Sequence, residues 1–74
     1  MTSLTMTSWR AGLQTVSLIA AVQRYSGLPL GRAKSEVERF LAGEAVSLQF
    51  PSERSKHEFR AAAEALGVTL VEGG

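Results

Sequence analysis

The chain has 74 residues, of which 45% are hydrophobic, and its eight lysines and arginines nearly balance its seven glutamates, for a net charge of +1. A chain this short forms one domain and buries only about 60% of the surface that its unfolded form exposes, so a deep substrate cavity is not expected. Cysteine is absent, which excludes disulfides and thiolate metal sites and suits a reducing compartment. Aspartate and asparagine are absent as well. The near-neutral charge excludes a general attraction to nucleic acid or to an anionic membrane.

The sequence carries no pattern for membrane insertion or secretion. Its longest apolar run lies within residues 16–22 and is interrupted by Ser17, whereas a transmembrane helix needs about 20 apolar residues. The first four residues lack the basic region and the apolar stretch of a signal peptide. We therefore expect a soluble, cytoplasmic, single-domain protein with no membrane partner, with a loose N-terminal end over residues 1–4 and a folded core over residues 5–72.

The first half of the chain predicts a strand and two helices. Residues 5–11 favour a strand, which Gly12 interrupts. A helix is expected from Thr15 to Ser26, ended by Gly27, with an apolar repeat about every three residues: Val16, Ile19, Val22 and Tyr25, with Leu18 beside them. Residues 28 and 29 form a tight corner, and a second helix over residues 30–42 carries the apolar stripe Leu30, Ala33, Val37, Phe40 and Leu41.

The second half predicts a strand, a helix and a last strand. Residues 45–50 alternate with a period of two, which places Val46, Leu48 and Phe50 on one face of a strand. Ser52 suits the N-cap of a third helix and Glu53 suits its first turn. The buried stripe of that helix is expected to be Ser55, Phe59, Ala62, Ala63 and Leu66, and after Gly67 a last strand spans residues 68–71.

This order, β-α-α-β-α-β, predicts an α+β fold. The final β-α-β unit is expected to be right-handed, which leaves its two strands parallel. The first strand can lie between them, antiparallel to both, so that the three helices cover one face of a three-stranded sheet.

The corner Gly27-Leu28-Pro29-Leu30 followed by Ala33-Lys34 resembles a motif of one known family. That family is the C-terminal domain of the bacterial large-subunit ribosomal stalk protein (L-seven/L-twelve). The resemblance extends over about residues 12–72, with no gap between Ile19 and Val37. It implies a stalk-like domain fold, here in a free-standing relative without the family's N-terminal dimerisation region and hinge.

The resemblance also implies a function. In the family, the first two helices of this domain recruit translational GTPases to the ribosome. Lys34 and Leu30 are retained and Val16 matches an exposed apolar position, whereas Ala20, Gln23, Pro29, Gly31 and Arg32 replace the family's Lys, Arg, Gly, Lys and Glu. We therefore expect a non-enzymatic module, with a translation-related protein among its candidate partners, that binds through Val16, Ala20, Gln23, Leu28, Leu30, Arg32 and Lys34.

Two alternatives use other surfaces or partners. If Trp9 stands on the sheet face away from the helices, that face could serve self-association or nucleic-acid binding, although the chain shows no ladder of stacking aromatics. A Clp-protease adaptor has a similar fold, but its Asn-Asp motif cannot be present in a chain without either residue.

No residue set predicts catalysis, a cofactor or a metal. His57 is the single histidine and is expected on an exposed helix surface, because catalysis or metal binding would need convergent partners. Glu36 and Glu38, two apart on one helix, diverge, and Glu53 and Glu58 are five apart, so neither pair suits acid-base chemistry. Residues 27–31 lack the pattern of a phosphate-binding loop.

Overall fold

The computed structural model describes residues 2–72 and confirms the predicted α+β order. Its elements, in chain order, are β1 (Thr2–Trp9), α1 (Thr15–Ser26), α2 (Leu30–Leu41), β2 (Val46–Phe50), α3 (Glu53–Ala65) and β3 (Val68–Glu72). None of the helices within this range is both long and apolar enough to cross a bilayer.

The sheet has the predicted order, with β1 in the centre. β1 pairs antiparallel with β2, where Leu4 lies opposite Leu48, and antiparallel with β3, where Met6 lies opposite Leu70. The outer strands β2 and β3 therefore run parallel to each other. A register shift between Met6 and Ser8 inserts one extra residue into β1 opposite β3.

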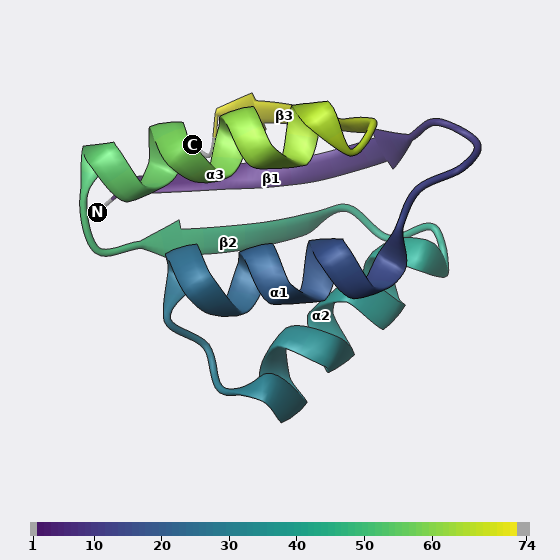
Figure 1. Ribbon diagram of the computed structural model, residues 1–74, viewed down its shortest axis with the longest axis horizontal. Coiled ribbons are helices and arrows are strands. Elements are labelled where there is room, and N and C mark those ends of the chain that lie inside the picture. Colours follow the sequence, from purple (N-terminus) through teal and green to yellow (C-terminus); the bar gives the residue numbers. More distant parts are fainter. Residues whose placement is uncertain (1, 73–74) are drawn as a thin grey trace.

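The helices form a layer against the sheet. Figure 1 shows α3 beside β1 and β3, α1 beside β2, and α2 outermost, beyond α1. All three helices contribute to one core with the inward side chains of the strands, and its largest fully buried members are Phe40, Phe59, Leu4, Met6, Leu18, Val22, Val37 and Val46. The alternation predicted for β2 is confirmed, since Val46, Leu48 and Phe50 are buried and the residues between them are exposed.

The predicted helix ends agree with the structure at two places. Gly27 follows α1 with a φ of 78°, a left-handed conformation that glycine adopts at low cost. Ser52 caps α3, because its Oγ accepts a hydrogen bond from the backbone N–H of Ser55 at 3.1 Å. Glu53 lies in the first turn of α3, as expected.

The prediction of a loose N-terminal end is wrong for residues 2–4. They form the start of β1, and the side chain of Leu4 is fully buried. β1 also ends at Trp9, two residues before the predicted end of the strand. The reason is tertiary: β2 and β3 provide pairing partners on both sides of this segment, and the core covers Leu4. Met1, also part of that prediction, lies outside the described residues.

The predicted apolar repeat of α1 does not stay on one face of the helix, and Val16 is exposed, as the resemblance implied. A helix turns by about 100° per residue, so a repeat of exactly three drifts by about 60° at each step and puts Val16 opposite Tyr25. In the structure the buried residues are Leu18, Ala21 and Val22, whereas Val16 is 82% exposed. In α2 the buried residues are Ala33, Val37 and Phe40, and Leu30, at its first position, is 59% exposed.

In α3 the stripe contains a residue that we did not expect. Phe59 and Ala63 are buried as predicted, and Lys56 is buried with them. Its ammonium group lies 2.9 Å from a carboxylate oxygen of Glu72 and 3.5 Å from one of Glu53. The aliphatic stem of a lysine can pack against the core while its charged end meets a carboxylate at the rim.

Candidate binding surface

The residues predicted to bind a partner fall into two groups in the structure. Val16, Ala20 and Gln23 are all exposed and follow one another at spacings of four and three along α1, so they share one face of that helix. This face lies opposite the buried residues of α1. A partner that approaches α1 from solvent meets these three side chains first.

On α2, Leu30 and Lys34 are the exposed members of the predicted set outside the cavity described below. They lie four residues apart, one helical turn, and both are exposed. Val16 and Leu30 are two of the four large apolar side chains that are exposed within residues 2–72, the others being Trp9 and Val71. We call the set Val16, Ala20, Gln23, Leu30 and Lys34 the outer helical surface.

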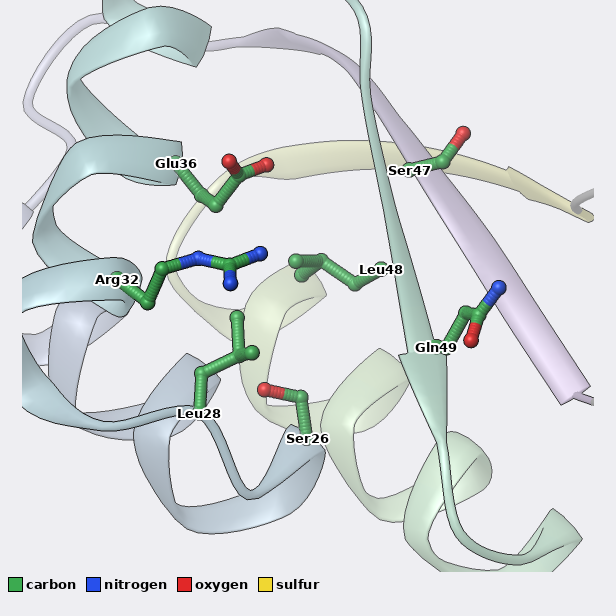
Figure 2. Close-up of a pocket in the computed structure, with 7 residues that line it drawn as sticks. All are labelled: Ser26, Leu28, Arg32, Glu36, Ser47, Leu48 and Gln49. Carbon is green, nitrogen blue, oxygen red and sulfur yellow. The ribbon is translucent and has the colours of Figure 1, made fainter.

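The two remaining predicted residues, Leu28 and Arg32, belong to a different feature. They line a cavity of about 350 Å³ between α2 and the edge of the sheet, together with Ser26, Glu36, Ser47, Leu48 and Gln49. Figure 2 shows the side chains of Leu28, Arg32 and Glu36 directed into this space, with Leu48 facing them from β2. Arg32 and Lys34 point to nearly opposite sides of α2, since two residues along a helix turn the side chain by about 200°.

The cations of α2 differ in their partners. Arg39 donates to Glu36 at 3.2 Å and to Glu44 at 3.3 Å, and these carboxylates, Glu44 first, raise the pKa of Arg39 above its ordinary value. Within residues 2–72 no carboxylate lies within ion-pair distance of Arg32 or Lys34. Two cations on opposite sides of α2 are therefore available to an acidic partner.

The structure corrects the premise of the sheet-face alternative. The extra residue in β1 reverses its alternation, so Trp9 turns to the helix side and its ring lies 4.9 Å from that of Phe40 in α2, centroid to centroid. The opposite sheet face carries polar residues such as Ser47, whose hydroxyl lies 2.8 Å from that of Thr5. Self-association and nucleic-acid binding through that face stay predictions, now without the tryptophan on which they depended.

The titratable residues of α3 form an ionic group, in which Lys56 pairs with Glu53 and Glu72, and Glu53 accepts from the Thr2 hydroxyl. His57 is exposed, as predicted. The hydrogen bond from the Thr2 hydroxyl is the main cause that lowers the pKa of Glu53, with Lys56 adding to it. Among the described residues, no three histidine, cysteine, aspartate or glutamate side chains are grouped as metal ligands would be.

Sequence reasoning missed most of the cavity. It placed residues 45–50 in an outer strand and the corner at residues 28–29, but it did not bring the two together. The missing information was the path of α2, which returns from the corner to the start of β2 and so leaves a space between its own side chains and the sheet edge. A pattern signal was nonetheless present for two of the lining residues: Arg32 and Glu36 are four residues apart, which places them on one side of α2.

Comparison of the chain with protein-family models, with curated proteins and with solved structures finds no match. The resemblance to the ribosomal stalk domain therefore stays a prediction that concerns the motif at the corner and the order of the elements.

Proposed function

We propose that this chain is a non-enzymatic, cytoplasmic interaction module whose protein partner binds the outer helical surface. The observation that carries the proposal is the exposure of Val16 and Leu30, at 82% and 59%, on the two helices to which the family resemblance assigns partner binding. Fully burying an exposed valine or leucine is worth about 1.5–3 kcal/mol, so two such residues are suited to anchor an interface.

Lys34 gives this surface a positive charge. It lies one turn from Leu30 and has no carboxylate within ion-pair distance among residues 2–72. An apolar centre with a cation at its side favours a partner that presents apolar side chains next to an acidic one. The corner motif adds the narrower proposal that this partner is a translational GTPase, as in the stalk family.

The experiment captures partners from the native host on the immobilised chain and identifies them by mass spectrometry. The test variants are Val16→Glu and Leu30→Glu, and the matched control is Val71→Glu, which adds the same charge at an exposed valine of β3. We expect each test variant to weaken binding of a purified captured partner by about tenfold or more and the control to leave it unchanged. A partner that binds all three variants as it binds the unmodified chain would refute the proposed surface.

The narrower proposal has its own test. A purified translational GTPase from the same host is titrated with the chain and with Lys34→Glu. We expect saturable binding that the variant weakens, because the cation next to Leu30 is reversed. Binding of another captured partner, without binding of any translational GTPase, would remove the link to the stalk family and keep the interaction module.

A further inference from the structure

The free edge of β2 borders the cavity between this strand and α2. In the sheet order β2-β1-β3, β2 pairs with β1 alone. In an antiparallel pair every second residue directs its backbone N–H and C=O away from the partner strand, so part of the backbone of β2 has no ladder partner within residues 2–72. Three consecutive β2 residues line the cavity: Ser47, Leu48 and Gln49.

The cavity is lined by two leucines and by one cation without a carboxylate partner among the described residues. Leu28 is half-buried and Leu48 is 3% exposed, and both line the cavity. The hydroxyl of Ser26 donates to the carbonyl of Val22, and Glu36 accepts from Arg39, so both of these polar groups are already paired. Arg32, directed into the same space, has no carboxylate within ion-pair distance in the described part of the chain.

We propose that this cavity, the α2–β2 groove, binds an extended peptide segment that pairs with β2 and places a carboxylate against Arg32. The unpaired backbone groups of an edge strand recognise an extended chain, and a guanidinium group forms a bidentate pair with a carboxylate. A volume of about 350 Å³ lies at the small end of ligand sites, which span about 300–1,000 Å³, and therefore suits side chains of a peptide rather than a large cofactor. This site is separate from the outer helical surface and does not depend on it.

The geometry also predicts the pattern of the peptide. Successive side chains of a strand point to opposite faces. One set would enter the groove, where an apolar residue meets Leu28 and Leu48 and an acidic residue two positions away meets Arg32. The other set would lie beside Ser47 and Gln49, which Figure 2 shows directed away from the cavity, and is therefore expected to be polar.

The test uses two blocked pentapeptides, acetyl-Thr-Leu-Thr-Glu-Thr-amide and acetyl-Thr-Glu-Thr-Leu-Thr-amide, which present the pattern in both chain directions. Each is titrated into the isotope-labelled chain and followed by amide and arginine side-chain NMR resonances. We expect shifts at the amides of residues 47–49 and at the Nε–H of Arg32, with saturation at millimolar concentrations. Replacing the glutamate of the peptide by glutamine, or N-methylating its central residues, is expected to weaken binding at least about fivefold.

The matched protein variants are Arg32→Glu and Lys34→Glu. Both reverse a charge on exposed side chains of α2, but only Arg32 lines the groove. We expect Arg32→Glu to weaken binding about tenfold or more and Lys34→Glu to leave it unchanged, with the rest of each spectrum showing a folded chain. The proposal is overturned by an absence of β2 shifts with both peptides, by equal effects of the two variants, or by shifts of the β2 amides that follow the concentration of the chain alone. The last result would assign the edge to a second copy.

Discussion

The change of leucine to alanine at Leu4 and at Leu30 tests the structure at the two places where it departs most from the sequence pattern. Leu4 falls in the predicted loose end but is 0% exposed, whereas Leu30 falls in the predicted apolar stripe of α2 but is 59% exposed. Truncating a buried leucine costs about 2–5 kcal/mol, because apolar contacts are lost and a cavity remains. Truncating an exposed one changes stability by about 0.5 kcal/mol or less.

The loss at Leu4 is large compared with the total stability. A chain of this length is stable by about 4–11 kcal/mol, if each residue contributes about 0.05–0.15 kcal/mol. Leu4 lies in the central strand, opposite Leu48 on one side and Glu72 on the other, so β2 and β3 limit how far the structure can collapse around the missing methyl groups. We therefore expect Leu4→Ala to remove about a fifth or more of the free energy of unfolding.

The assay is urea denaturation followed by far-ultraviolet circular dichroism and by the fluorescence of Trp9. With a slope of about 1–2 kcal/mol per molar urea, Leu4→Ala is expected to lower the midpoint by more than about 1 M and Leu30→Ala by less than about 0.5 M. If Leu4→Ala does not fold, Leu4→Val gives the smaller loss of about 1 kcal/mol expected for one methylene. Equal losses at Leu4 and Leu30, or a larger loss at Leu30, would refute the packing described for β1 and α2.

The remaining predictions concern the corner and the ionic group of α3. Gly27→Ala is expected to lower the free energy of unfolding by about 1–2 kcal/mol, because alanine disfavours a φ of 78°. Gly31→Ala lies within α2 with open space around it and is expected to raise that free energy by about 0.5–1 kcal/mol. Thermal unfolding of both variants checks this, and a change of stability in the same direction for both would contradict it. The pKa of Glu53 lies below its ordinary value of 4.5, so its contribution to stability is present above that pH and is lost as pH falls through the lowered pKa. The pKa of Lys56 is raised from 10.5, first by its hydrogen bond to Glu72, so its contribution is present below that pH and is lost as pH rises through the raised pKa. As pH is lowered through the acid range, the urea midpoint is expected to fall less steeply for Glu53→Gln than for the unmodified chain. Glu38→Gln, at an exposed glutamate of α2, is the control and is expected to behave as the unmodified chain does. If the midpoint of Glu53→Gln falls with pH as steeply as that of the unmodified chain, the contacts assigned to Glu53 are contradicted.

Local patterns predicted the elements because each pattern has a local physical cause. The alternation in residues 45–50 predicts a strand with one buried face, and Ser52 predicts a helix start because its side chain accepts a backbone N–H nearby in the chain. Gly27 ends α1 for the same kind of reason, since the left-handed conformation is a property of one residue. The handedness rule for β-α-β units then predicted that β2 and β3 are parallel, with room for β1 between them, and this is the observed order.

Patterns failed where burial depends on which other element lies nearby. Leu4 is buried because two strands flank it. Lys56 can be buried because its ammonium group forms an ion pair with Glu72, sixteen residues away. Trp9 faces Phe40 rather than solvent on the open sheet face because one extra residue in β1 reverses the alternation. None of these contacts can be read from the residue type or from its immediate neighbours.

One candidate site was indicated by the sequence, and the other became visible only in the tertiary structure. The residues themselves determined that this is a small α+β domain with two apolar helices joined at a glycine-proline corner, and they indicated the outer helical surface through a resemblance at that corner. Helical periodicity already separates Arg32 from Lys34, but only the tertiary structure brought Arg32 to the edge of β2, because the position of α2 beside the sheet depends on the packing of the whole core. The conformational preference of a residue depends on that residue and its near neighbours in the chain, whereas the distance between a helix and a sheet edge is set by all the side chains that fill the space between them.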